Sequence, residues 1–517
     1  MSPPIPDIPS GDTITPAATL DTSLGMAARE GLSVAPERVG DERAPDGPQA
    51  VQAGAAASAG AASALVALSA LSILLVIIAA DRPSFLTRGS ARELFPAWIA
   101  GPLHGLWPQL HPSATTLMSL VSAVMVAMFC CYVVALRFGA HLRLRWTLAT
   151  IVALHVIFFL SPPLQYTDVF NYINYGRMAV VDHLNPYTVI PLLEPHADPS
   201  FALSNWHGLL SPYGPLFTQL TEALVPLGVP ASLWALKLAD GVASLATLLL
   251  VWRTAQLLGR RPAAAVAFAG LNPLALVWGL GAVHYDSIMM LFLVLSVYLV
   301  VRSRRTPDAW SSSRRLQVGA GAGLAVAVAI KVAAGIALPI FLLSGRSRRM
   351  LAGLIPTAAV LAAASYASFG LHGPDLTAQS TMINVHGLPD VLGYALGFGG
   401  ETHGMHTALT ITLLLAVVVC SAWAWRSPEH WITAAGMVML ALVLSLSWSV
   451  PWYVLWILPF AALSGSRRLR AIVLVLSAYF LLSFMPAEPG LANRVGFHPQ
   501  STAIGRASGR AVAALGG

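Results

Sequence analysis

The feature that most constrains this chain is a series of apolar runs, many about 20 residues long, which recur from near Ala61 to about residue 485. A helix of that length crosses a hydrocarbon core of roughly 30 Å. Only 10% of the 517 residues are charged, against about 25% in a soluble domain, so most of the surface must face lipid. Because a backbone in lipid must satisfy its own hydrogen bonds, the pattern predicts an all-α integral membrane protein.

We predict a polytopic helical bundle of about 11–13 transmembrane segments. The clear candidate spans are 61–80, 114–136, 146–162, 232–256, 263–282, 287–301, 350–369, 406–425, 431–448, 452–464 and 471–485. Two further stretches are ambiguous. Segment 215–228 is short and ends near proline, and segment 318–343 carries Lys331 in its middle.

The two ends of the chain differ in composition from the membrane domain, which we expect over 59–486. Residues 1–58 are rich in Pro, Gly, Ala, Asp and Glu, which predicts a disordered N-terminal tail. Residues 487–517 are expected to form a flexible C-terminal tail. The first apolar run lies far from the N-terminus and lacks a basic segment just before it, which favours a membrane anchor over a cleaved signal.

Arginine-rich loops orient the predicted spans, and the net charge of +7 is explained by them: LRFGAHLRLRW, GRRP, RSRRTPDAWSSSRR, SGRSRRM and SGSRRLR. The positive-inside rule places all of them in the cytoplasm. This requires that 215–228 returns to the side it left and that 318–343 is a hairpin of two half-helices. Such re-entrant elements must be buried in protein or line a wet cavity. The alternative is that one or two arginine loops face outward.

With this orientation, loop 163–213, the turn 281–287, loop 371–405 and the turn 447–453 share the outer face. The stretch YTDVFNYINYGRMAVVDHLNPYTV, residues 166–189, predicts a short amphipathic helix at 169–181 along the membrane interface. Asp168, Tyr172 and Tyr175 would share one stripe of it. Structural roles stay open, because aspartate favours helix N-caps and tyrosine anchors at membrane boundaries. Arg177 could bind phosphate oxygens or snorkel to lipid phosphates.

Three more ionisable groups lie in apolar surroundings. The turn GAVHYDS places His284 and Asp286 between two spans, and an ionisable residue at membrane depth is a functional candidate by default. An interfacial position for both would weaken that argument. Lys331 falls near the apex of the predicted hairpin, where a partner anion is expected. The alternative is a lysine that snorkels or loses its proton.

Several other functions find no support in the sequence. It holds no GxxxxGK[ST] loop, no nucleophile elbow and no GxGxxG after a strand. It shows no basic face on a soluble domain, so nucleic acid is not an expected partner. The three cysteines lie inside apolar runs, and the histidines of loop 371–405 match no metal-binding spacing.

Several motifs resemble the membrane glycosyltransferases of the GT-C class: TDVFNYINYGRMAVVDHLNPYT, SPYGPLFTQL, GLNPLALVWGLGAVHYDSIMMLF, IKVAAGIALPIFLL and SWSVPWYVLWILPF. Over roughly residues 60–485 the chain resembles in particular the bacterial polyprenol-phosphate-mannose-dependent mannosyltransferases. These include the actinobacterial α-1,6-mannosyltransferases of lipomannan assembly. The first of these motifs is the most specific.

The resemblance implies an enzyme of the bacterial plasma membrane that transfers a sugar on the outer face. The donor would be a polyprenyl-phosphate sugar, the acceptor a hydroxyl of a glycan or glycolipid, and the anomeric configuration would be inverted. By position, Asp168 would be the catalytic base. Candidates for binding the donor phosphate are Arg177, Lys331 and His284, and candidates for binding substrate are Tyr172, Tyr175, Asn185, Tyr187, Asp286, Trp452 and Tyr453.

Two departures from the simplest GT-C pattern bear on the metal and on the alternatives. The acidic loop follows the third predicted span rather than the first, and it lacks an adjacent pair of acidic residues. A metal requirement is therefore doubtful, and no cofactor is expected. The main alternative is a transporter or flippase for lipid-linked sugars, although no convincing internal repeat is visible. A non-catalytic scaffold, an oligosaccharide ligase and a protein mannosyltransferase also stay open.

Overall fold

The structure, a computed structural model, describes residues 48–81, 97–106, 113–164, 168–305, 310–345 and 348–516. Every regular element among these residues is a helix, which confirms the all-α class. The chain divides into two units, Met1–Val51 and Gln52–Gly517, and the site described below belongs to the second. Residues 1–47 of the predicted tail lie outside the described residues. Residues 48–58, which we also predicted as tail, begin helix α1 instead, because their alanines favour a helix.

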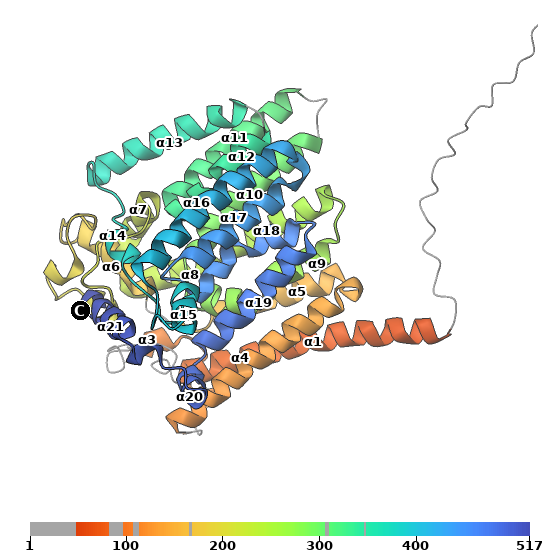
Figure 1. Cartoon of the computed structure of the whole chain (residues 1–517), viewed down its shortest axis with the longest axis horizontal. Coiled ribbons are helices and arrows are strands. Elements are labelled where there is room, and N and C mark those ends of the chain that lie inside the picture. Colours follow the sequence, from red (N-terminus) through yellow and green to blue (C-terminus); the bar gives the residue numbers. More distant parts are fainter. Residues whose placement is uncertain are drawn as a thin grey trace, which may run out of the picture. The chain divides into compact units, whose positions relative to one another are not determined.

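The membrane domain is built mainly from long apolar helices (Figure 1). These are α1 (Pro48–Asp81), α4 (Ala114–Arg137), α5 (Leu144–Phe159), α8 (Gly228–Leu257), α10 (Asp286–Arg305), α11 (Trp310–Ile330), α13 (Arg348–Phe369), α16 (His403–Arg426), α17 (Trp431–Ser445) and α19 (Arg467–Phe484). Helices α8, α10, α11 and α13 pack in a row, each against the next. Shorter helices complete the domain: α3 (Ala97–Ala100), α6 (Asp168–Val180), α7 (Pro215–Leu224), α9 (Pro262–Gly270), α12 (Leu338–Gly345), α14 (Thr377–Ser380), α15 (Leu388–Ala395), α18 (Leu458–Leu463), α20 (Glu488–Arg494) and α21 (Ala503–Gly516).

Fewer helices pass a test of length and apolar composition than the 11–13 spans that we predicted. By length and apolar composition, seven helices of the described residues can cross a membrane, or up to nine if each of two bent pairs is one span. Three apolar segments that we counted as whole spans or half-helices are too short for this test: Leu144–Phe159, Val332–Ser344 and Pro451–Leu463. The prediction of 11–13 spans counted apolar runs. The sequence alone did not show how long the helix within each run would be.

Segment 318–343 turns back at Lys331 as predicted, although its first arm, α11, is a full 21-residue helix and not a half-helix. Helix α11 ends at Ile330, Lys331 is extended (φ −150°, ψ 120°), and the chain returns through the 3₁₀ helix η7 (Val332–Ala337) and α12. Arg304, at the end of α10, donates a hydrogen bond to the carbonyl of Ser344 at 3.0 Å. Ser313, near the start of α11, donates to the carbonyl of Ser303. Both arms of the hairpin therefore start and end beside the same end of α10.

The chain also bends at Asn272–Pro273, where a proline inside an apolar run removes a backbone donor. Helix α9 and the π-helix η6 (Ala275–Gly281) meet at this point with a bend of 63°. The Asn272 side chain stabilises the break, because its Oδ1 accepts a hydrogen bond from Leu274 N at 2.9 Å and its Nδ2 donates to Ser477 on α19. The π-helix then leads directly into the turn that carries His284.

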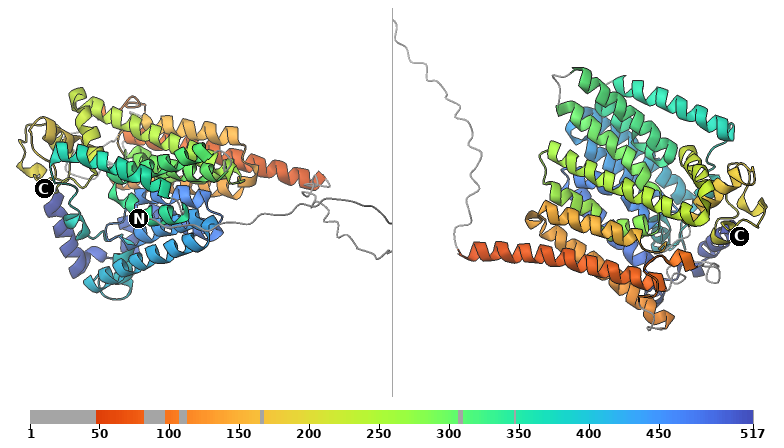
Figure 2. Two further views of the ribbon diagram at one scale, coloured as in Figure 1. Left: turned by 90° about the horizontal axis from the view of Figure 1, so that it is seen from above. Right: turned by 180° about the vertical axis from the view of Figure 1, so that it is seen from behind.

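Several short helices lie at one end of the domain (Figures 1 and 2): α6, α7, α14, α15 and α21. Helix α6 forms where predicted, but nine of its 13 residues are buried, so it is enclosed by protein rather than lying on an interface. Gly176 allows this packing, since a Cβ there would lie 2.7 Å from the Thr221 carbonyl carbon of α7.

The predicted flexible C-terminal tail is wrong over its described residues. Residues 487–516 form α20, a 3₁₀ turn and α21 (Figure 2). Helix α21 docks on the loop that follows α6, where Gly208 N donates to the carbonyl of Leu515 at 2.9 Å. Ser508 Oγ also donates to the carbonyl of Ile383. A helix held at both these points orders the segment.

Candidate active site

Asp168 is the first residue of α6, where the backbone dipoles of the helix favour a negative charge. Its Oδ1 atom accepts a hydrogen bond from the Trp206 indole Nε1 at 3.1 Å and a longer one from Asn171 Nδ2 at 3.5 Å. The backbone N–H of Trp206 donates to Asn171 Oδ1, which fixes the indole beside the carboxylate. The Asp168 side chain is 13% exposed. It is enclosed and still reachable from outside.

The second oxygen of Asp168 faces His284. Asp168 Oδ2 lies 3.3 Å from His284 Nε2, and His284 Nδ1 lies 2.5 Å from the carbonyl oxygen of Trp278. A carbonyl can only accept, so Nδ1 carries a proton. Nε2 is therefore the ring nitrogen that faces the Asp168 carboxylate. The imidazole stacks on Trp452 at a centroid distance of 3.7 Å.

The backbone before His284 is strained. Val283 has φ of 61°, in the left-handed region that a β-branched residue avoids. Such a conformation costs roughly 1–3 kcal/mol and persists only where the surrounding structure enforces it. Here His284 N donates to the carbonyl of Gly279 in the π-helix at 3.0 Å, which closes the turn. The strain fixes the direction in which the imidazole points.

Lys331 lies in a cage of aromatic rings with a carboxylate at one side. Its Nζ atom is 2.8 Å from Asp286 Oδ1, and the same oxygen accepts from Trp456 Nε1 at 2.5 Å. The ammonium also lies 4.6 Å from the ring centre of Tyr285, 5.2 Å from that of Tyr453 and 5.1 Å from that of Trp456. Asp286 is the partner anion expected for this lysine.

Aromatic rings join the carboxylate and ammonium parts of the site. The ring of Trp452, which stacks on His284, lies 5.9 Å from that of Tyr453, and Tyr453 stacks on Trp456 at 4.0 Å. Asp168, His284 and Lys331 are therefore arranged along one continuous aromatic wall. This arrangement can accept a proton at one end and stabilise a negative charge at the other.

A polar network ties α6 to the loop that covers it. Arg177 binds Asp198 through Nε and Nη2, with contacts of 2.8–2.9 Å. Burial alone would raise the pKa of Asp198, but hydrogen bonds from Arg177 and Ser200 outweigh it, and the pKa lies below the usual value. Ser200 also donates to Asn174, which in turn donates to Glu194. Burial raises the pKa of Glu194 to about 7.

Comparison with known proteins places the chain in a family. The model described as "Alpha-(1->6)-mannopyranosyltransferase, N-terminal domain" matches residues 66–345, more than half of the chain. The chain belongs to the α-(1→6)-mannopyranosyltransferase family. A second model, "MptB C-terminal domain", matches residues 383–514 and includes the helices at the C-terminus. The protein is a multi-pass membrane glycosyltransferase.

Two curated members of the family show the extent of the similarity. The α-(1→6)-mannopyranosyltransferase A of Mycobacterium tuberculosis is 29% identical over 367 residues, which cover 63% of this chain and 67% of the relative. The α-(1→6)-mannopyranosyltransferase B of Corynebacterium glutamicum is 26% identical over 377 residues, which cover 65% and 62%. No solved structure matches this glycosyltransferase.

The structure brings some of the predicted site residues together and separates others. Asp168, His284, Trp452, Tyr453, Asp286 and Lys331 converge as described above. Arg177 pairs with Asp198 instead, so its binding of a donor phosphate stays a prediction. Three predicted substrate ligands make hydrogen bonds within the fold: Tyr175 to the carbonyl of Leu209, Tyr187 to the carbonyl of Tyr213, and Asn185 to the carbonyl of Phe369. Tyr172 packs edge-on against Tyr213, Phe217 and Tyr285.

Sequence reasoning missed three aromatic residues of this glycosyltransferase. Trp206 contacts Asp168 from 38 positions away, and Trp456 contacts Asp286 from 170 positions away. Tyr285 lies between His284 and Asp286 in the chain and completes the cage. The sequence does offer one signal for Tyr285, since it stands between two residues that were already candidates.

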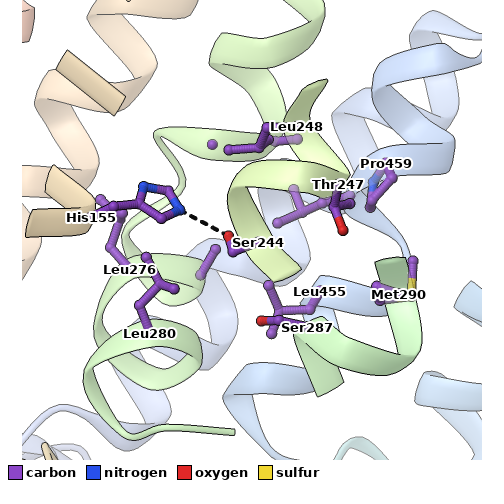
Figure 3. A pocket seen from close by; sticks show the side chains of 14 residues that line it. His155, Ser244, Thr247, Leu248, Leu276, Leu280, Ser287, Met290, Leu455 and Pro459 are labelled. Atoms are coloured by element: carbon purple, nitrogen blue, oxygen red, sulfur yellow. Dashed lines mark hydrogen bonds between the residues drawn. The ribbon is translucent and has the colours of Figure 1, made fainter. Parts of the chain in front are cut away.

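A separate small cavity lies among α5, α8, η6 and α10 (Figure 3). It has a volume of about 40 Å³, and His155 donates to or accepts from Ser244 across one wall at 3.0 Å. Ser287, one residue after Asp286, lines another wall. A cavity of this size can hold a water molecule or two but not a sugar. It lies in the core beside the site, and the substrates must bind elsewhere.

Proposed function

We propose that this glycosyltransferase moves mannose from a polyprenyl-phosphate carrier to a hydroxyl of a glycan or glycolipid, with inversion at the anomeric carbon. The observation that carries the proposal is the Asp168 carboxylate, held by Trp206 and His284 next to the Lys331 cage. The choice of mannose is supported by the names of the relatives, and the carrier is supported by the cation beside an apolar surface.

In the proposed reaction, the acceptor hydroxyl oxygen attacks the anomeric carbon from the face opposite the phosphate. The bond from that carbon to the phosphate oxygen breaks, and its electron pair leaves with the lipid phosphate. The hydroxyl proton passes to the Asp168 carboxylate, which faces His284 Nε2 at 3.3 Å. A base positioned in this way contributes about 10²–10⁴-fold to the rate.

The leaving phosphate needs a fixed positive charge, which we assign to Lys331, since both ring nitrogens of His284 face other partners, Trp278 and Asp168. An ammonium has three N–H donors, and one of them is directed to Asp286. The aromatic cage holds the group without neutralising it. The Lys331 side chain is 15% exposed, and the next residue, Val332, is 50% exposed. The cage therefore opens beside an apolar surface, where a polyprenyl chain could lie.

The proposal places this site on the outer face of a bacterial plasma membrane. Arg304 donates hydrogen bonds to the carbonyls of Ser344 and Pro428, so arginine-rich ends of several helices meet at one end of the domain. Asp286 begins α10 at its opposite end, and Lys331 stands at the tip of the hairpin. If the arginine end is cytoplasmic, the site faces outward.

The proposal includes no cofactor and no metal. Among the described residues, no group of three or more His, Cys, Asp or Glu side chains is arranged to hold a metal ion. Independence from metal stays a prediction, to be checked by assaying the purified protein after treatment with a chelator.

The test is a transfer assay on purified protein in lipid nanodiscs, with radiolabelled polyprenyl-phosphate mannose, glucose and arabinose offered in parallel. We expect product from mannose, and nuclear magnetic resonance of the product gives its anomeric configuration. Asp168→Asn and Asp168→Ala should each lower the rate by about 10²-fold or more. Asp375→Asn, in an exposed loop, is the matched control.

Two results would contradict the proposal. Wild-type activity in both Asp168 variants would remove this carboxylate from the mechanism. Movement of the intact lipid carrier across the membrane with no glycoside formed from any donor would favour the flippase alternative.

A further inference from the structure

The two oxygens of the Asp168 carboxylate face different surroundings. Oδ2 faces His284, and beyond it lie Trp452 and the Lys331 cage. Oδ1 faces Trp206, whose ring centre lies 6.0 Å from that of Trp448 at an interplanar angle of 81°. A lipid phosphate is an anion, so it suits the first side. The groups that touch Asp168 on the second side are a neutral indole and a neutral amide.

Both indoles are held in place by their surroundings. Trp206 is fixed by Asn171, and the loop two residues further on is fixed by Gly208 N, which donates to α21. Trp448 follows Ser447, whose Oγ donates to Glu401 at 2.9 Å and whose carbonyl accepts from Asn384 N at 3.0 Å. A binding surface that is ordered before the ligand arrives loses less entropy on binding.

Neither residue is fully buried. Trp206 and Trp448 are both half-buried, so each remains partly exposed. Sites for small ligands are typically lined by aromatic rings with a few well-placed polar groups. A pyranose ring has an apolar face of C–H groups that fits an indole, and hydroxyl groups at its edge. A sugar stacked here would place an edge hydroxyl near Asp168 Oδ1.

We infer that Trp206 and Trp448 form the subsite for the acceptor, which binds the terminal pyranose ring of a glycan or glycolipid. This inference rests on the proposed function, and it adds which side of Asp168 the acceptor occupies. Trp448 contributes a stacking surface alone. Trp206 contributes a surface and also a hydrogen bond that positions the catalytic carboxylate.

The two roles predict different kinetic effects. Trp448→Ala should raise the acceptor KM about tenfold, the loss expected when a stacking ring leaves a binding site, with donor KM and kcat nearly unchanged. Trp206→Phe keeps a ring but removes the N–H group on Asp168. It should lower kcat about tenfold and change the acceptor KM by less than about threefold. Trp146→Phe, an exposed tryptophan at the far end of α5, is the control.

A rise in donor KM with an unchanged acceptor KM in Trp448→Ala would overturn the inference, as would wild-type kinetics in that variant. If Trp448→Ala does not fold, Trp448→Phe replaces it, with an expected rise in acceptor KM of about threefold because the smaller ring keeps part of the contact.

A binding measurement separates this inference from the proposed function. Saturation-transfer difference spectra are recorded for α-1,6-linked mannobiose with the purified protein and no donor. We expect a signal on the sugar C–H protons that weakens severalfold in Trp448→Ala and persists in Trp146→Phe. That result together with no transfer from any polyprenyl-phosphate donor would defeat the proposed function and leave the sugar subsite standing. Active enzyme whose mannobiose signal is equal in all variants would defeat the subsite alone.

Discussion

Replacing one member of the Lys331–Asp286 pair should destabilise the fold, and by a different amount for each member. The two side chains meet at 2.8 Å, with the Asp286 side chain 0% exposed and that of Lys331 15% exposed. Removing one partner of a buried pair leaves an uncompensated charge and typically costs about 3–5 kcal/mol. The surroundings of each charge decide where in that range the effect falls.

The carboxylate depends on its partner more than the ammonium does. In Lys331→Met, Asp286 keeps one hydrogen bond from Trp456, while its Oδ2 atom is buried without a hydrogen-bond partner among the described residues. We expect a loss of about 4–5 kcal/mol. In Asp286→Asn, the ammonium still faces three aromatic rings, each worth about 0.5–2 kcal/mol to a cation. We therefore expect only about 3 kcal/mol.

The double variant Asp286→Asn/Lys331→Met buries no charge and should be more stable than Lys331→Met alone. The assay is the free energy of unfolding of the detergent-solubilised protein in a titration with sodium dodecyl sulfate, at fixed pH and salt. Arg305→Met, an exposed cation, serves as the control and should change stability by less than about 0.5 kcal/mol. Single effects that simply add, or a Lys331→Met variant as stable as the control, would refute the reasoning.

Three further predictions concern the supports of the site. Arg177→Lys keeps the charge but loses the two-pronged contact with Asp198, so it should lower the free energy of unfolding by about 1–2 kcal/mol; an unchanged melting temperature would contradict this. The pKa of Glu194 is raised from 4.5 to about 7 by burial, so the folded state holds a proton that the unfolded state releases between these values. The contribution of Glu194 to stability should fall by on the order of 3 kcal/mol as pH rises through that window, and Glu194→Gln should make the slope less steep in melting curves recorded from pH 4 to 8. Gly214→Ala would push a Cβ into the carbonyls of Ala329 and Ile330 and should destabilise by about 2 kcal/mol or more. Gly373→Ala, where a Cβ meets nothing within 4 Å, should leave the melting temperature unchanged.

The parts of the fold that could be predicted are those set by local physics. The positive-inside rule requires segment 318–343 to return to the side it left, which predicts a hairpin with Lys331 near its apex and an anion beside it. Asn272–Pro273 predicts a kink because proline removes a backbone donor. The acidic start of α6 follows from the preference of aspartate for helix N-termini. The last two inferences need only a few neighbouring residues.

The parts that could not be predicted depend on which distant faces meet. No residue near Asp168 in the sequence indicates that Trp206 will contact it. Trp456 likewise contacts Asp286 although the two are 170 positions apart. We assigned Arg177 to phosphate binding, whereas in the fold it pairs with Asp198, 21 positions away. That pairing could be predicted only with knowledge of how the intervening loop folds. The C-terminal helix could have been predicted from the sequence, because AIGRASGRAVAALG places small apolar residues and arginines at helical spacing.

The three ionisable anchors of the site all stand where a helix is interrupted. Asp168 begins α6, His284 follows the π-helix and the strained Val283, and Lys331 is extended between α11 and η7. An interruption frees backbone groups, which at membrane depth must be satisfied inside the protein. One freed carbonyl, that of Ile330 at the end of α11, accepts a hydrogen bond from Gly214 N at 3.1 Å. This bond joins the start of α7 to the hairpin apex. The backbone bond that satisfies the end of α11 therefore also joins the loop that carries Trp206, which contacts Asp168, to the residue before Lys331.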